Sequence, residues 1–180
     1  MPGARGKEPT IKSQGTTKER VMRKLLLILT TLSLLLASAR AEPTIIGERD
    51  GKDVVTVRAG EATQSKQGLP NFVGISGATA GAKHLSLLKV VIPPGGSAEA
   101  HVHKGYESAI YLMQGRVETR YGEGLKKSVV NVAGDFLFIP PDVPHQPFNL
   151  SDTEPAIAIV TRNDPDEQEH VVLYPKDTKQ

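Results

Sequence analysis

The feature that most constrains the fold is a series of short apolar runs, each of strand length and each closed by turn residues. From residue 84 onward these runs lie at 84–92, 108–113, 116–121, 128–132, 135–139, 146–150, 156–161 and 170–173. Proline (13 residues) and glycine (17 residues) separate the runs, and no helical pattern lies between them. About eight short strands at regular spacing predict an all-β fold, an antiparallel sandwich or barrel.

The first 41 residues differ in composition from the rest. They hold eight Lys or Arg residues and two Glu, and they contain the uncharged run LLLILTTLSLLLAS at 25–38. A basic segment, a short apolar run and small residues after it are typical of a secretory signal peptide. As a helix the run spans roughly 21 Å, less than a hydrocarbon core of about 30 Å. We expect residues 1–41 to be cleaved near Ala41, with no stable membrane anchor. Met22 is an alternative start, and the choice stays open.

The chain that follows is expected to be secreted or periplasmic and mildly acidic, with 14 basic and 18 acidic residues and no cysteine. No disulfide can stabilise it, so its stability must come from a core and, where one binds, a metal. It shows no basic cluster with interleaved aromatic residues, so nucleic acid is not an expected partner. Residues 42–70 are polar and predict an N-terminal arm or edge strand, and residues 71–180 predict the barrel.

Four side chains have the spacing of a metal site. His101 and His103 lie two apart on an expected strand, so their side chains leave the same face about 7 Å apart at the Cα atoms. That separation suits two imidazoles on one ion, although a solvated strand face would show the same pattern. Glu107 follows, and His145 comes directly after a proline-rich turn that restricts the direction of its ring.

The first of these segments resembles a motif of the cupin superfamily. That motif reads roughly G-x5-H-x-H-x(3–4)-E-x6-G, and this chain offers Gly95, His101, His103, Glu107 and Gly115. Seven residues, not six, separate Glu107 from the glycine.

The second segment resembles the partner motif of the same family, G-x5-P-x-G-x2-H-x3-N. Here the chain offers Gly134, Pro140, Asp142 in place of glycine, His145 and Asn149. We expect the Asp142 replacement to be tolerated, because Asp adopts a left-handed turn conformation more easily than most residues. The resemblance covers about residues 71–174 and implies a cupin jelly roll, a double-stranded β-helix barrel, with a metal inside its mouth.

The position of Glu107 leaves one question open. A shift of one residue along a strand turns a side chain to the opposite face, unless a bulge or the preceding turn absorbs it. Either Glu107 is the fourth ligand, as in the related pattern H-x-H-x3-E-[S/T]-A-x-Y of small single-domain cupins, or Ser108 stands at the usual acidic position.

The same question, which face of the strand points inward, applies to the substrate pocket. On a strand, Tyr111 and Met113 point to the same face as Glu107, whereas Ile110 and Leu112 point to the same face as Ser108. Whichever set faces inward lines the cavity. The candidates that we single out for the pocket are Tyr111, Met113, Phe138, Gln146 and Phe148.

The resemblance implies a divalent transition metal held by His101, His103, His145 and Glu107, with iron, manganese, nickel, copper or zinc all compatible with imidazole ligands. It implies either a metal-dependent enzyme acting on a small oxygen-bearing molecule, dioxygenase-like or an isomerase, or a barrel that binds a ligand or stores a metal without turnover. No residue stands out as a dedicated general acid or base. A homodimer is expected, because an open jelly roll leaves strand edges to cover.

Overall fold

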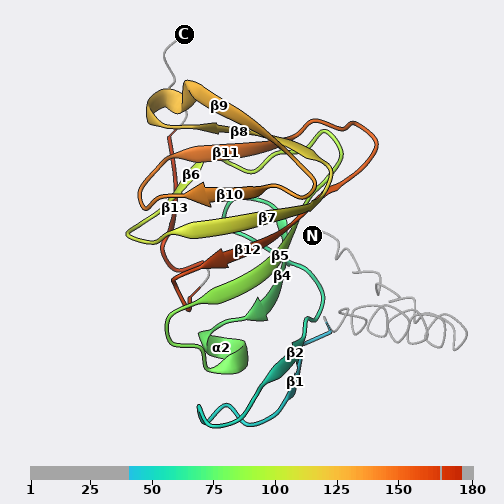
Figure 1. Ribbon diagram of the computed structural model, residues 1–180, viewed down its shortest axis with the longest axis vertical. Helices are drawn as coiled ribbons and strands as arrows, with labels where there is room; N and C mark the ends of the chain where they lie inside the picture. Colours follow the sequence, from blue (N-terminus) through green and yellow to red (C-terminus); the bar gives the residue numbers. More distant parts are fainter. Residues whose placement is uncertain (1–40, 167, 176–180) are drawn as a thin grey trace, which may run out of the picture. The chain divides into compact units, whose positions relative to one another are not determined.

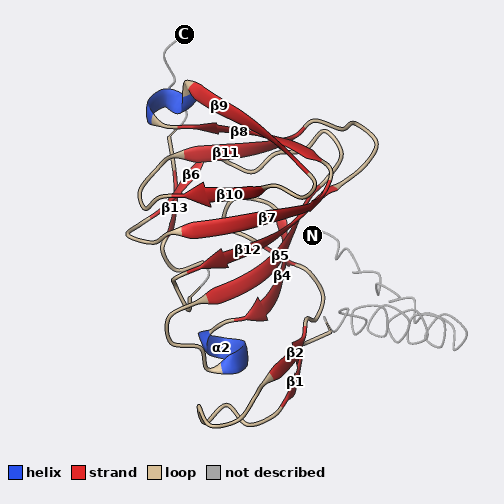
Figure 2. Ribbon diagram, viewed as in Figure 1, coloured by secondary structure: helices blue, strands red, loops and turns tan. Residues whose placement is uncertain are grey.

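The structure, a computed structural model, describes residues 41–166 and 168–175, and most of the regular structure in this part of the chain is β (Figure 2). The expected all-β, antiparallel fold is confirmed, since every strand pair recorded among these residues is antiparallel. The helical segments described are one turn each, α2 (Gly77–Ala80) and η1 (Glu123–Leu125).

The strands form two larger sheets and one small one (Figure 1). The six-stranded sheet has the order β10 (Phe136–Ile139), β7 (Ser108–Gln114), β12 (Ala156–Arg162), β5 (Ser86–Ile92), β4 (Pro70–Ile75) and β3 (Thr63–Gln64). The five-stranded sheet has the order β13 (Val171–Leu173), β6 (His101–His103), β11 (His145–Asn149), β8 (Arg116–Tyr121) and β9 (Lys127–Val132). A separate hairpin pairs β1 (Thr44–Ile46) with β2 (Thr56–Arg58).

From β5 onward, consecutive strands alternate between the two larger sheets, apart from the β8–β9 hairpin. The chain therefore winds back and forth between two layers, and the side chains that face inward from both layers form one interior. A buried apolar cluster lies there, contributed by β5, β7, β8, β12 and two loops: Leu69, Ile92, Ala98, Leu112, Val117 and Ala156.

Residues 42–70, expected to be an arm or edge strand, divide between two sheets. The hairpin of β1 and β2 forms its own sheet, whereas β3 pairs with β4 at the edge of the six-stranded sheet. The turn of α2 was not expected. It forms because Ser76 and Thr79 make a reciprocal capping box, which satisfies backbone N–H groups at the helix start.

Two turns need backbone that most residues avoid. Gly115, between β7 and β8, has φ 93°, and a Cβ atom there would lie 2.9 Å from Cα of Ala156. Asp142 has φ 62°, so the expectation that Asp adopts the left-handed conformation in this turn is confirmed. Its N–H donates to the carbonyl of His103 at 3.1 Å, which joins the turn before β11 to the end of β6.

The expected signal peptide lies outside the described residues, apart from Ala41. Within the described part of the chain, none of the helices has the length and apolar character that a membrane crossing requires.

Candidate metal centre

Three histidines meet on the inner face of the five-stranded sheet. His101 and His103 begin and end β6, and His145 begins β11 directly opposite His101. The ring centroids of His101 and His145 are 4.2 Å apart, and His103 lies 5.0 Å from the first and 5.2 Å from the second. One ring nitrogen from each histidine lies within 4.8 Å of the others, so the structure brings together the three histidines that the spacing singled out.

Backbone carbonyls orient two of the rings. Nδ1 of His101 is 2.7 Å from the carbonyl oxygen of Glu99, and Nδ1 of His145 is 2.9 Å from that of Val143. A carbonyl only accepts, so each Nδ1 carries the proton and each Nε2 keeps a lone pair. This is how metal-binding histidines are commonly held, with one nitrogen fixed by a hydrogen bond and the other directed at the ion.

His103 has a different environment. Its Nε2 is 3.2 Å from Nη2 of Arg162, which can donate a hydrogen bond to it, and its Nδ1 is buried without a partner. Arg162 comes from the end of β12 in the opposite sheet and also donates from Nε to Oγ of Ser108 at 3.2 Å. The guanidinium thus places a buried positive charge at the edge of the histidine cluster.

The three imidazoles are neutral near pH 7. Burial, together with the neighbouring His145, lowers the pKa of His101 to about 3, and burial with the nearby Arg162 charge lowers the pKa of His145 to about 4. Burial and the Arg162 charge also lower the pKa of His103 far below its ordinary 6.5. Neutral imidazole is the form that ligates a metal, so the rings need no deprotonation to bind one.

Glu107 does not join this group. Its side chain is exposed, and its N–H donates to Oδ1 of Asn163. The next residue, Ser108, begins β7 and is 1% exposed, with its hydroxyl against Arg162. No bulge absorbs the one-residue shift at this point, because Ser108 pairs in register with Ile139 and with Arg162. The arrangement described is therefore three histidines with Ser108 facing inward.

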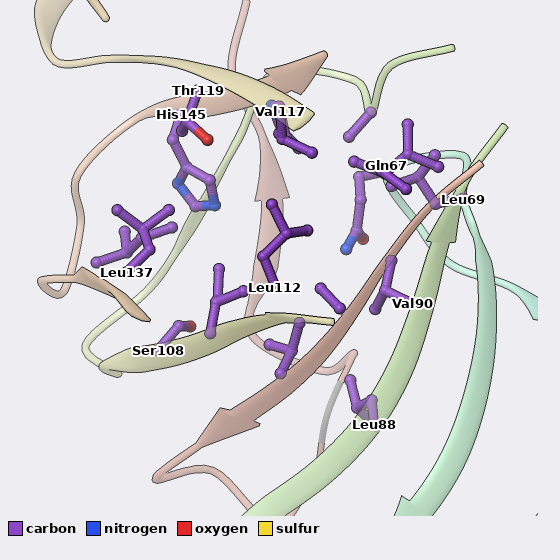
Figure 3. A pocket seen from close by; sticks show the side chains of 18 of the residues that line it. Gln67, Leu69, Leu88, Val90, Ser108, Leu112, Val117, Thr119, Leu137 and His145 are labelled. Carbon is purple, nitrogen blue, oxygen red and sulfur yellow. The ribbon is translucent and has the colours of Figure 1, made fainter. Parts of the chain in front are cut away.

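A cavity of about 890 Å³, a volume that includes solvent at its mouth, lies between the sheets beside the histidines. Figure 3 shows His145 entering it at one side and Gln67 at the other, with aliphatic side chains such as Val117 and Leu112 between them. The walls are mainly aliphatic, and no Phe, Tyr or Trp contributes to the part of the lining that the structure describes. The cavity can therefore hold a small molecule against the histidines, away from bulk water.

None of the five pocket candidates lines this cavity. Tyr111, Met113 and Phe138 are exposed on the outer face of the six-stranded sheet. Tyr111 and Met113 lie on the same face of β7 as Ala109, and Phe138 of β10 pairs opposite Ala109. The amide of Gln146 donates to the carbonyl of Ala98, and the ring of Phe148 lies under the Arg120 guanidinium. Ile110 and Leu112, which lie on the same face of β7 as Ser108, line the cavity instead.

Sequence reasoning missed several polar residues of the cavity, among them Arg162, Gln67 and Asn71. Arg162 had a detectable signal, because it continues the alternation of Ala156, Ala158 and Val160 and so falls on the same inward face. Gln67 and Asn71 had none, since they flank a turn in a polar segment with no clear period.

The residues present fit a divalent transition metal. Two neutral rings have their Nε2 lone pairs free, whereas the Nε2 lone pair of His103 faces Arg162 and would bind an ion only in place of that contact. Imidazole nitrogen suits iron, manganese, nickel, copper and zinc, and three ligands leave coordination positions for water or substrate.

Comparison with known families and structures agrees with this description. The model of the family described as Cupin domain matches residues 88–162, which include all three histidines. The barrel has the cupin fold. The family match and the fold together support the cupin superfamily, and the expected double-stranded β-helix is confirmed.

Three solved structures illustrate the likeness. An uncharacterized conserved protein with a double-stranded β-helix domain from Klebsiella pneumoniae has a TM-score of 0.52 at 18% identity, covering 73% of this chain and 97% of that one. Oxalate decarboxylase of Lactobacillus farciminis, in a formate complex, has a TM-score of 0.53 at 23% identity, covering 63% of this chain. Oxalate decarboxylase of Bacillus subtilis, described with Mn(II) centers, has a TM-score of 0.54 at 19% identity, also covering 63%.

The aligned part of this cupin barrel spans 33% of the Lactobacillus enzyme and 29% of the Bacillus enzyme. A comparison with curated proteins gave no match.

Proposed function

We propose that this chain is a metal-binding cupin and that it is an enzyme acting on a small oxygen-bearing molecule with the help of a divalent transition metal. One observation carries the proposal: three buried, neutral imidazoles converge at the wall of a cavity that opens to solvent at its mouth and can admit a small molecule. Such a cluster has little value as packing alone, because burying polar nitrogen without a partner costs free energy.

The residues of the chain have distinct tasks in this proposal. His101, His103 and His145 hold the ion, and backbone carbonyls fix two of the rings in the ligating tautomer. The aliphatic walls keep water away from the reacting groups. The bound ion would supply Lewis acidity and positions for a chelating substrate or dioxygen. Arg162 adds a positive charge that favours an anionic oxygen group on the substrate.

A dioxygenase-like oxidative cleavage is the reaction class that we place first. Decarboxylation of a small acid is the second, supported by the likeness of the barrel to oxalate decarboxylases, one of them described with Mn(II) centers. Isomerisation stays a third class.

A cupin that binds a ligand without turnover is the alternative, and one contact favours it. If Arg162 donates to Nε2 of His103, that lone pair is not available to a metal. Among the described residues, no carboxylate joins the three histidines as a fourth ligand or base.

Metal analysis of the full chain tests the proposal. We expect the purified protein to carry close to one transition metal, and His101→Ala or His145→Ala to lose most of it. His84→Ala, a change at an exposed histidine away from the cavity, is the matched control. Glu107→Gln should keep full occupancy, because its carboxylate lies outside the group.

The metal-loaded protein is then assayed for oxygen uptake with catechol, cysteine and a keto acid, and for carbon dioxide release from oxalate. Turnover that disappears in His101→Ala supports the enzyme. A metal-loaded protein that is inert on all of them favours ligand binding, and equal metal content in wild type and both histidine variants rejects the site.

We also propose that the mature protein is exported and forms a homodimer. The export rests on the signal-peptide pattern and is tested by the mass of the protein recovered outside the cytoplasm, expected to begin near Glu42. The dimer is supported by the edge strand β10, where the rings of Phe136 and Phe138 are 82% and 57% exposed. Light scattering on the purified protein measures it.

A further inference from the structure

Two amide side chains in the cavity have oxygens without partners. Oε1 of Gln67 and Oδ1 of Asn71 are buried and accept no hydrogen bond, and the two residues are only 8% and 2% exposed. Both line the same cavity as the histidines, and Figure 3 shows the Gln67 side chain extending into it from the side opposite His145. A third oxygen of this kind, Oδ1 of the less buried Asn131, lines the cavity from β9.

The backbone around Gln67 is held in place. In the turn between β3 and β4, the N–H of Leu69 donates to Oγ of Ser65, and the N–H of Ser65 donates to the carbonyl of Leu69. The carbonyl of Gln67 accepts from the N–H of Glu99 at 2.7 Å, which joins the turn to the segment before β6. The side chain therefore enters the cavity from a rigid turn.

Asn71 is fixed by the sheet. It lies in β4, opposite Val90 of β5 and Thr63 of β3, and its carbonyl accepts from the hydroxyl of Thr63. Its backbone is thus paired while its side-chain oxygen is not. The contrast matters, because buried polar groups in native proteins are nearly always paired with protein, water or ligand.

An aliphatic residue at either position would suit the surroundings better. The nearby walls are formed by side chains such as Leu69, Leu88, Val90 and Leu112. Leaving an amide oxygen unpaired among them lowers the stability of the folded state, whereas an apolar side chain of the same size would not. The two oxygens are hydrogen-bond acceptors positioned for something that enters the cavity.

We propose that Gln67 and Asn71 are specificity-determining residues for a ligand with an aliphatic middle and a hydroxyl group at the end away from the histidines. The hydroxyl donates to Oε1 of Gln67 or to Oδ1 of Asn71, and the aliphatic part packs on the cavity walls. A flat aromatic ligand is disfavoured, since no Phe, Tyr or Trp of the described lining can stack on it.

The identity of the other end of the ligand, an oxygen group facing the histidines, rests on the proposed function. The hydroxyl end does not, so it is tested without metal.

The test uses the full chain treated with EDTA and two probes that differ in one donor, 1-pentanol and its methyl ether. Affinities are measured by NMR titration. We expect wild type to bind the alcohol about three- to tenfold more tightly than the ether, as the net value of one hydrogen bond implies. Gln67→Met and Asn71→Leu should each reduce this preference, and the double variant should abolish it.

Gln64→Met is the matched control, because Gln64 lies in the same hairpin with its side chain exposed. It should bind like wild type. The melting temperatures of Gln67→Met and Asn71→Leu should equal or exceed that of wild type, since each removes an unpaired polar group. If one variant does not fold, the other decides the matter.

Failure to bind the alcohol, equal binding of alcohol and ether by wild type, or a preference that persists in the double variant would overturn the inference and leave the amides as sites for a buried water. These results are independent of the metal. A preference for the alcohol in a protein that binds no metal rejects the proposed function alone, and a metal-loaded protein without the preference rejects this inference alone.

Discussion

At the scale of single residues, the molecule holds three neutral histidines next to a permanent positive charge. The Arg162 guanidinium and deep burial both act against protonation of the rings, so the pKa values of His101 and His145 fall to about 3 and about 4. In the unfolded chain the same rings titrate near 6.5. The two states therefore bind different numbers of protons at mildly acidic pH, and stability depends on pH there.

This difference sets the acid sensitivity of the metal-free protein. Well above pH 6.5 the histidines are neutral in both states and contribute no pH dependence. As the pH falls below 6.5, the unfolded chain takes up protons that the folded barrel does not, so the free energy of unfolding decreases until about pH 3. Between pH 6.5 and 5 each ring can contribute up to about 2 kcal/mol.

Urea denaturation of EDTA-treated protein at a series of pH values checks this prediction. His145→Asn should show a shallower decline than wild type, and the change at exposed His84, His84→Asn, should follow wild type. A wild-type curve that is flat from pH 7 to 5 would show that the rings are already charged or solvated.

At the scale of elements, one side chain of the second motif connects several loops. The buried Asn149 ends β11, and its Nδ2 donates to the carbonyls of Ile92, Pro93 and Glu154, at 3.1, 3.1 and 2.8 Å. Its Oδ1 accepts from the N–H of Ser151. The end of β5 and the turn between β11 and β12 are thus held to the end of β11, which helps to align the two sheets around the cavity.

Asn149→Ala should lower the free energy of unfolding by about 2–4 kcal/mol, because it removes the donor to three carbonyls, of which that of Ile92 is buried. Asn163→Ala is a suitable comparison, since Asn163 is exposed and receives one backbone hydrogen bond. Its loss should be about 1 kcal/mol or less. Both are measured by chemical denaturation, and equal losses would argue against a structural role for the Asn149 amide.

At the scale of the whole molecule, the metal ligands exist as a group only in the folded barrel. The histidines come from β6 and β11, which lie far apart in the sequence, and Arg162 reaches them from the other sheet. An ion that binds this group binds the folded state far better than the unfolded chain, and it therefore stabilises the entire fold.

Adding Mn²⁺ or Zn²⁺ to EDTA-treated protein should raise the melting temperature, and the rise should grow with the logarithm of the ion concentration once the site is filled. His103→Ala should show little or no rise. Differential scanning calorimetry measures both proteins. A rise of the same size in the variant would mean that the ions bind elsewhere on the surface.

Much of the molecule could be predicted from the sequence. The Pro and Gly turns and the apolar runs predicted the strands that form the two sheets, because turn chemistry and period-two patterns act locally. The two spaced motifs predicted which histidines would meet, and Asp142 adopts the expected turn. The predicted signal peptide is not part of what the structure describes.

The register at the start of β7 and the contents of the cavity depended on tertiary structure. Sequence reasoning placed Glu107 in the metal set and left Ser108 as the alternative, and only the pairing of β7 with β10 and β12 turned Ser108 inward and left Glu107, Tyr111 and Met113 outside. Likewise, Gln67 and Asn71 enter the cavity because a hairpin closes against a distant segment. Alternation along a strand is a local property, but which face becomes the interior is decided by the strands that pair beside it.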